Sequence, residues 1–295
     1  MASLKQIIES NGLSFSEAAR IIGCDKSQVV KVSNHTYPHW EEKEPEFIAK
    51  LNSAGCTAIA PQGFKIDPDV LVCTPSVSNF QLLADSLSDP EGRLSSSIGM
   101  VIGTAERGKS FTSRWYVQNN PLAAYVLYVD GSTKYQLLGD ICEAVAHTRP
   151  HSFAACISVL EETCRYNRRL VIIDEADKIP VRQLEILRAV NERARLPFLI
   201  VGEEGLKVKT DRIPRLRSRI RNPLVVFEPA QAVDVLAYYQ TAAQLQIDRR
   251  TAERLARHAD GGFRTIVNDA DALSKMSAAS GIDMITDSML DRLGA

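Results

Sequence analysis

The feature that most constrains this chain is the stretch Gly103-Thr-Ala-Glu-Arg-Gly-Lys-Ser110, which fits the pattern G-x-x-x-x-G-K-[ST] at every position. An apolar run, Ile98–Ile102, precedes this stretch, and a segment of helical character follows it to about Asn119. A strand, a glycine-rich loop and a helix in this order surround a phosphate group with backbone amides and a helix N-terminus. The sequence therefore predicts a nucleotide-binding loop that follows a strand of a sheet.

The residues of this loop and of the first helical turn are expected to bind ATP. They are Gly103, Thr104, Ala105, Glu106, Arg107, Gly108, Lys109, Ser110 and Phe111. Lys109 would neutralise the β- and γ-phosphates, and the Ser110 hydroxyl would ligate Mg²⁺. Glu106 is unusual at its position because it brings negative charge near the phosphates, and we expect Arg107 beside it to offset that charge.

A second motif, Leu170-Val-Ile-Ile-Asp-Glu-Ala-Asp177, predicts a buried strand that ends in acidic residues. Asp174 would hold the Mg²⁺ shell, and Glu175 would orient and polarise the attacking water. The alternative is an acidic strand end that only caps the next helix. Together the two motifs predict ATP and Mg²⁺ as cofactors, and they predict an ATPase because Glu175 has no role in binding alone.

Two arginines are candidates to complete the site. Arg219 lies just before the last expected strand, where many ring-forming ATPases place an arginine that reaches the neighbouring subunit's nucleotide. Arg264 begins a helix, which suits an arginine that contacts the γ-phosphate of its own chain. Each could instead be a solvated surface arginine, and Arg215, Arg217 and Arg221 compete with Arg219 for the first role.

The alternation of short apolar runs with helical segments from 98 to 227 is typical of a parallel sheet covered by helices on both faces. The expected strands are Ile98–Ile102, Ala123–Val129, Leu170–Ile173, Phe198–Val201 and Leu224–Phe227. Every segment beyond Pro229 has helical character, and the prolines and glycines of 54–76 indicate a linker. We therefore predict a helix-turn-helix domain at 1–60, a linker at 61–76, an α/β core at 77–228 and a helical lid at 229–295.

The N-terminal segment carries two local helix signals. Ser14 and Glu17 form a capping-box pattern, and Gly23 would end the helix that follows. The spacing typical of a helix-turn-helix is made by Ala19, Gly23, Val29 and Val32. The side chains that would then face a DNA groove are Lys26, Ser27, Gln28 and Lys31. Any tight helical hairpin could show this spacing, so protein–protein docking is the alternative to DNA contact.

The net charge of −1 conceals an uneven distribution. Arg165–Arg221 has fifteen Lys and Arg against eight Asp and Glu, a net of +7 that leaves −8 on the rest of the chain. Its densest part, Lys207–Arg221, can neutralise DNA phosphates, although a solvated basic face or an inter-subunit contact is the alternative. Lys134, in the loop after the second expected strand, is a further candidate for DNA backbone contact or else ordinary surface.

The sequence also predicts the compartment. No run approaches 18 apolar residues, and Lys5 and Glu9 interrupt the segment that a signal peptide would need. We therefore expect no membrane partner and a cytoplasmic location. The six cysteines form no C-x-x-C pair and are expected to be buried thiols.

Taken in order along the chain, these motifs resemble the AAA+ transposition B proteins of Mu and other transposable phages. The most specific stretch is Leu170–Asp177, and the likeness covers essentially the whole chain. The resemblance implies an AAA+ P-loop core between a helix-turn-helix domain and a helical lid. It also implies ATP-bound helical filaments on double-stranded DNA of any sequence, which deliver that target DNA to a phage transposase. The transposase would then trigger ATP hydrolysis. A phage protein of this kind would act in the cytoplasm of a bacterial host cell.

The chain departs from the family after the fourth expected strand, where a polar amide usually holds the catalytic water. Gly202-Glu203-Glu204 stands there instead, so the resemblance implies slow intrinsic turnover. Two other functions fit the same motifs: a helicase loader of the same ATPase branch, and a transcriptional regulator in which ATP sets the oligomeric state. A nucleotide-binding scaffold that does not hydrolyse ATP is a third alternative.

Overall fold

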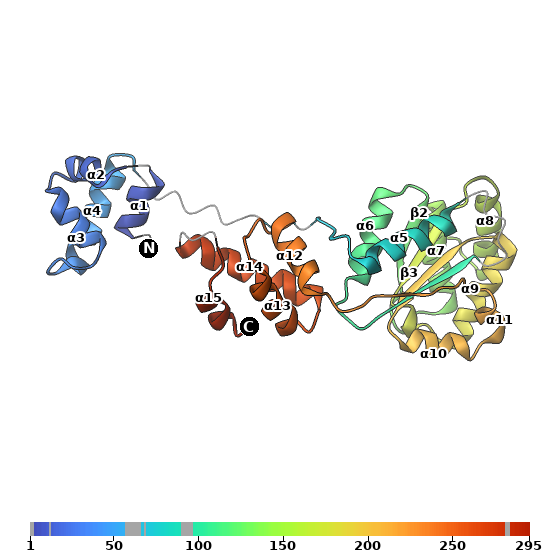
Figure 1. Ribbon diagram of the computed structural model, residues 1–295. Helices are drawn as coiled ribbons and strands as arrows, with labels where there is room; N and C mark the ends of the chain where they lie inside the picture. The colour runs from blue at the N-terminus through green and yellow to red at the C-terminus, as the bar shows by residue number, and fades with distance from the viewer. Residues whose placement is uncertain (1–2, 12, 57–65, 68, 90–96, 281–283) are drawn as a thin grey trace. The chain divides into compact units, whose positions relative to one another are not determined.

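The computed structural model describes residues 3–11, 13–56, 66–67, 69–89, 97–280 and 284–295 (Figure 1). The chain divides into two compact units. The sheet unit consists of Pro68–Tyr238 and Ala252–Asn268, and the helical unit consists of Met1–Asp67, Tyr239–Thr251 and Asp269–Ala295. Residues 61–65 and 68 of the expected linker lie outside the described residues.

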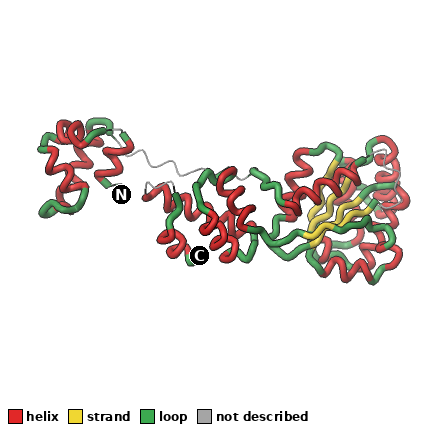
Figure 2. Tube along the Cα trace, in the orientation of Figure 1, coloured by secondary structure: helices red, strands yellow, loops and turns green. Residues whose placement is uncertain are grey.

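Within the described residues, the sheet unit contains five parallel strands in the order β2-β3-β4-β1-β5. Figure 2 draws the strands in yellow among the helices of this unit. The strands are β1 Ile98–Ile102, β2 Ala123–Leu127, β3 Leu170–Asp174, β4 Phe198–Gly202 and β5 Val225–Val226. Every residue of β1, β3 and β4 is buried, as a sheet covered on both faces requires. The prediction of a parallel α/β core is confirmed, and the shared carboxyl edge of its strands can carry a site.

Helices cover both faces of this sheet and produce two separate apolar cores. On one face, α7 Lys134–Ala146, α8 Phe153–Tyr166 and α9 Val181–Ala194 pack against the strands. On the other face, α5 Pro75–Ser88 and α6 Lys109–Asn119 pack against them. Three short segments complete the described part of 97–227: η1 Ala176–Lys178, α10 Gly205–Asp211 and α11 Pro214–Arg217.

Helix α5 corrects the expected end of the linker. Thr74 caps this helix by accepting a hydrogen bond from the Val77 amide, and Pro75 takes the first helical position, where it costs no hydrogen bond. The Ser76 hydroxyl donates to the carbonyl of Val226 in β5 at 3.2 Å. Residues 75 and 76 therefore belong to the sheet unit and are not linker.

The N-terminal segment forms four helices around an apolar cluster. They are α1 Leu4–Ser10, α2 Phe15–Ile22, α3 Lys26–Ser33 and α4 Trp40–Ser53. The capping box is confirmed, because the Glu17 amide donates to the Ser14 hydroxyl and the Ser14 amide donates to the Glu17 carboxylate. Gly23 ends α2 in the left-handed conformation, at φ 79°.

The helix pair α2 and α3 packs through the residues that the sequence pattern singled out. Ala19, Val29 and Val32 are buried in the cluster. On the other side of α3, Lys26, Ser27 and Lys31 are exposed and Gln28 is half-buried. The burial of these residues is consistent with the spacing, and the helix-turn-helix and its DNA-binding role both stay predictions.

The residues beyond Pro229 are helical wherever the structure describes a regular element. The helices are α12 Ala232–Thr241, α13 Arg249–His258, α14 Phe263–Ser280 and α15 Asp287–Leu293. Within the described part of the chain, no helix combines the length and apolar character that a membrane span needs. The expectation for the cysteines holds only in part, because Cys142 and Cys156 are buried whereas Cys73 is exposed.

Candidate nucleotide-binding site

The glycine-rich loop joins the end of β1 to the start of α6, as the sequence predicts. Gly103 begins the loop against the backbone of Phe227, where a Cβ atom would lie 2.8 Å from the carbonyl oxygen. Gly108 ends the loop in the left-handed conformation and forms the N-terminus of α6. Both glycines are therefore required by the local backbone, and together they aim the N-terminus of α6 into the loop.

Lys109 lies inside the loop, and only 8% of it is exposed. Its ammonium group donates hydrogen bonds to the carbonyl oxygens of Gly103 at 2.8 Å and Thr104 at 2.7 Å. Burial lowers the pKa of Lys109, and the nearby carboxylates of Glu203 and Asp174 oppose that shift. The loop thus holds a positive charge at its centre, where it can meet a phosphate group.

Asp174 ends β3 beside the loop and is only 2% exposed. One carboxylate oxygen accepts a hydrogen bond from the Tyr125 hydroxyl at 2.8 Å, and the other accepts from the Glu175 amide at 2.9 Å. Burial, followed by this hydrogen bond to Asp174, raises the pKa of Tyr125. Tyr125 therefore fixes the orientation of the carboxylate, a contact that the sequence analysis missed.

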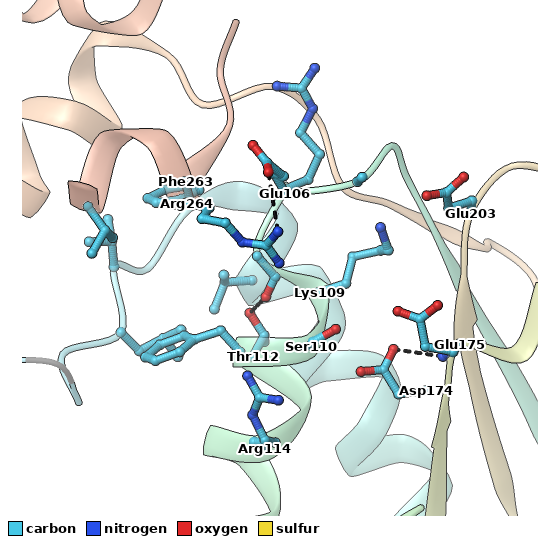
Figure 3. A pocket seen from close by; sticks show the side chains of 18 of the residues that line it. Glu106, Lys109, Ser110, Thr112, Arg114, Asp174, Glu175, Glu203, Phe263 and Arg264 are labelled. Carbon is cyan, nitrogen blue, oxygen red and sulfur yellow. Dashed lines mark hydrogen bonds and ion pairs between the residues drawn. The ribbon is translucent and has the colours of Figure 1, made fainter. Parts of the chain in front are cut away.

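Glu175 follows Asp174 in the left-handed conformation, at φ 59°. Its carboxylate pairs with the ammonium group of Lys178 at 2.7 Å. Glu203 follows the neighbouring strand β4, and its amide donates to the Asp177 carboxylate at 3.1 Å. The position where an amide side chain was expected from the resemblance thus presents a carboxylate at the cavity (Figure 3).

Two adjacent residues of the loop, Glu106 and Arg107, are contacted by the start of α14 and by Asp260 in the turn before that helix. The Phe263 amide donates to the Glu106 carbonyl at 2.8 Å, and Arg264 pairs with the Glu106 carboxylate at 3.3 Å (Figure 3). Arg107 is buried and binds Asp260, through the backbone carbonyl and through the carboxylate. The expectation that Arg107 offsets the charge of Glu106 is wrong, because Arg264 makes that ion pair.

These elements enclose a cavity of about 390 Å³. Its polar lining includes most of the expected site residues, namely Glu106, Arg107, Lys109, Ser110, Asp174, Glu175 and Arg264. Ala105, Gly108 and Phe111 also line it, whereas Gly103 and Thr104 contribute their carbonyl oxygens to Lys109. An apolar wall, which the sequence analysis missed, is formed by Val70, Leu71, Val72, Tyr238, Phe263 and Val267.

The apolar wall suits a nucleobase, and the opposite end suits phosphates and a hard cation. Ser110 and Asp174 supply a hydroxyl and a carboxylate oxygen, and Mg²⁺ typically takes only one or two protein carboxylates beside phosphate oxygens and water. Among the described residues, no group of three or more His, Cys, Asp or Glu side chains could hold a metal ion. The donor set therefore fits Mg²⁺ bound together with a nucleotide and does not form a closed metal cage.

Arg219 lies beside the amino-terminal ends of the strands, at the end of the sheet opposite the glycine-rich loop. The residue after it, Ile220, pairs with Ile98 at the start of β1, whereas the loop follows the end of β1. The length of this strand, about 13 Å at the usual rise per residue, separates these two ends of the sheet. Arg219 pairs with Glu192 at the end of α9 and does not meet the cavity of its own chain.

Some other cations of the expected basic cluster form ion pairs or hydrogen bonds within the sheet unit, and others are exposed. Lys207 pairs with Asp211 at 2.7 Å, and Arg221 donates to the Ser86 hydroxyl at 2.6 Å. Arg212 and Arg215 are exposed, as is Lys134 at the start of α7, whose ammonium group lies 5.4 Å from the centre of the Phe153 ring. The cluster keeps exposed positive charge on α10, α11 and the turn that joins them.

The cavity and its sheet agree with comparisons to known proteins. Residues 93–208 match the family model described as an AAA domain. A "potential ATP-binding protein" of Staphylococcus aureus is 41% identical over 155 residues, which cover 42% of this chain and 56% of that protein. The chain thus spans little more than half the length of this curated relative.

Solved structures share the arrangement of the chain at low sequence identity. The Aeropyrum pernix ORC2 protein in its ADP form has a TM-score of 0.56 at 17% identity, over 77% of this chain and 69% of that chain. The chain has the AAA+ P-loop ATPase fold. The Thermotoga maritima RuvB Holliday junction branch migration motor shares this AAA+ fold, with a TM-score of 0.52 at 16% identity over 78% and 72% of the two chains. Drosophila ORC bound to DNA gives 0.52 at 15% identity, over 81% and 65%.

Proposed function

We propose that this protein is a Mg²⁺-dependent ATPase whose ATP-bound form assembles on double-stranded DNA and delivers that DNA to a transposase. The observation that carries the ATPase part is the convergence of the glycine-rich loop, Asp174 and Glu175 on one cavity. The AAA domain match and the ATP-binding name of the Staphylococcus aureus relative support the same conclusion.

The residues of the cavity that the motifs predict for catalysis and metal binding each have a defined part in this proposal. Lys109 and the amides at the start of α6 bind the phosphates, and Ser110 and Asp174 hold the metal ion. A bound Mg²⁺ supplies neutralisation of the charge that develops on the phosphate oxygens. Glu175 orients the attacking water and accepts its proton, for which it must leave Lys178. Arg264 stabilises the γ-phosphate.

Assembly follows from the position of Arg219 in the proposal. Arg219 lies at the amino-terminal ends of the strands, away from the cavity of its own chain, and it is therefore available to the cavity of another copy. ATP bound between two copies would then stabilise their contact, and hydrolysis would weaken it. This arrangement supports a homo-oligomer that forms with ATP.

DNA as the partner is supported by the exposed charge of Arg212, Arg215 and Lys134 and by the exposed residues of α3. Phosphate contacts by such side chains give affinity without sequence preference. Two structures with the same fold are consistent with this partner: Drosophila ORC bound to DNA and the RuvB Holliday junction branch migration motor. The delivery of DNA to a phage transposase rests on the resemblance to the phage transposition B proteins.

The test is ATP-dependent binding to duplexes of unrelated sequence by wild type and by Lys109→Ala. We expect the wild type to bind every duplex when ATP is present, and we expect the variant to lose this ATP dependence. Equal binding by both proteins would contradict the proposal. Footprinting on a long duplex separates the transcriptional regulator from a filament. A single protected palindrome would indicate the regulator, and uniform protection would indicate a filament.

A further inference from the structure

Glu106 adopts a backbone conformation that is poorly suited to its residue type. It lies in the glycine-rich loop at φ 66°, in the left-handed region that glycine adopts freely and that other residues adopt at a cost. A glycine at this position would give the same loop without that cost. The carboxylate of Glu106 also lies in a cavity that we propose to receive phosphates, where like charges repel.

The contacts of Glu106 all lead to the start of α14. Its carbonyl accepts from the Phe263 amide, and its carboxylate pairs with Arg264. Gly262 leaves room for the side chain, since a Cβ atom there would lie only 3.2 Å from the Glu106 carboxylate. The backbone and the side chain of Glu106 therefore both contact the start of α14, and Gly262 provides the space for that side chain.

We propose that Glu106 is a positioning residue that holds Arg264 beside the phosphate loop and yields it to the terminal phosphate of a nucleoside triphosphate. The inference rests on the proposed binding of ATP and adds a role for a residue of the loop itself. Both partners are accessible, with 75% of the Arg264 side chain and 36% of the Glu106 side chain exposed. The exchange of one anionic partner for another therefore needs no rearrangement of buried groups.

The exchange leaves the rest of the junction intact. Arg107 is 9% exposed and stays bound to Asp260, and the backbone bond between Phe263 and Glu106 does not involve the carboxylate. The start of α14 therefore stays at the loop whether Arg264 pairs with Glu106 or with a phosphate. For the same reason, a variant that lacks only the carboxylate keeps the fold of the junction.

This arrangement makes Glu106 a determinant of selectivity between triphosphate and diphosphate. A nucleotide that recruits Arg264 must break its ion pair with Glu106, whereas a diphosphate leaves the pair in place. Removal of the carboxylate ends its charge repulsion with the phosphates of either nucleotide. It also frees Arg264 from the ion pair, and only the triphosphate has the terminal phosphate that Arg264 can then bind. The signature of the exchange is therefore a gain in affinity that is larger for ATP than for ADP.

The experiment measures the dissociation constants of a non-hydrolysable ATP analogue and of ADP, both with Mg²⁺, by calorimetry on the full chain. We expect Glu106→Gln to tighten binding of the analogue about two- to fivefold more than binding of ADP, the range of an exposed ion pair. Glu106→Gly, which also relieves the backbone, should show the same selective gain. Glu162→Gln, which removes an exposed carboxylate of α8, should leave both constants unchanged.

The double variant Glu106→Gln with Arg264→Gln assigns the effect to the pair. In the Arg264→Gln background, the substitution of Glu106 should tighten binding of the ATP analogue and of ADP by the same factor. An equal gain for both nucleotides in the wild-type background, or a loss of ATP affinity, would overturn the exchange and leave the proposed ATPase intact. A wild type that binds neither nucleotide would instead contradict the proposed function and, with it, this inference.

Discussion

Lys178 forms an ion pair with Glu175 across 2.7 Å, one turn of a 3₁₀ helix after the end of β3. Glu175 is the residue that we propose to polarise the attacking water, and its backbone is held in the left-handed conformation. The hydrogen bond and the charge of Glu175 raise the pKa of Lys178, so the lysine keeps its positive charge at neutral pH. Lys178 therefore restrains the group that hydrolysis requires.

Replacement of this lysine should release the carboxylate. We expect Lys178→Gln to raise the basal rate of ATP hydrolysis about two- to fivefold, because the substitution removes the exposed ion pair that restrains the Glu175 carboxylate. Phosphate release without DNA measures this rate, and Lys207→Gln, which removes a cation of another exposed pair, is the matched control. A slower rate in Lys178→Gln would mean that the lysine supports catalysis.

Glu175→Gln should separate binding from hydrolysis. The amide keeps the size of the side chain but cannot accept a proton, so the variant should bind ATP and DNA and accumulate as a stable complex. We expect phosphate release to fall by roughly 10²-fold or more while DNA affinity with ATP is retained. Rapid turnover by this variant would assign the polarising role to another residue.

Tyr125 should tune the metal site through Asp174. In Tyr125→Phe the carboxylate loses the hydroxyl donor at 2.8 Å, and such supporting contacts typically change metal affinity by about tenfold or more. We expect the Mg²⁺ concentration for half-maximal ATP hydrolysis to rise by roughly that factor, with a stability loss of about 1 kcal/mol. Tyr128→Phe serves as a control, because this tyrosine lies directly after β2 and its hydroxyl donates to Ser132 and Gln183 instead of Asp174. An unchanged Mg²⁺ requirement would leave Tyr125 a purely structural role.

Arg219 can be tested by mixing subunits. Arg219→Ala and Glu175→Gln should each be inactive alone, for different reasons. In a mixture, the Arg219 side chain of a Glu175→Gln subunit can reach the nucleotide site of an Arg219→Ala subunit, which still has its Glu175. Such mixed sites are complete, so phosphate release should recover in part. Arg215→Ala, an exposed arginine of the same segment, should keep activity without mixing. If the mixture stays inactive, Arg219 does not act between subunits.

The parts of the fold that the sequence predicts well are those set by local pattern. The strands β1, β3 and β4 are short runs of buried apolar residues, and their positions agree with the expectation to within one residue. Helix α5 was missed because Pro75 suggested a linker, although Thr74 followed by a proline is also the signal of a helix start. A breaker residue alone does not distinguish these two cases.

The contacts within the site were harder to predict because they join distant parts of the chain. Lys109, Asp174 and Glu175 follow from motifs with fixed spacing, and all three line the cavity. The partner of Glu106 is Arg264, 158 residues further along, whereas the sequence suggested its neighbour Arg107. No local sequence pattern predicts such a pairing, since it depends on the tertiary fold that brings the start of α14 to the loop.

The most direct test of the proposed ATP-dependent assembly is electron microscopy of the full chain on long duplex DNA with a non-hydrolysable ATP analogue. We predict continuous helical filaments with the analogue, none without nucleotide, and none for Lys109→Ala under either condition. Filaments that form without nucleotide, or that persist in Lys109→Ala, would contradict the claim that ATP in this cavity drives assembly on DNA.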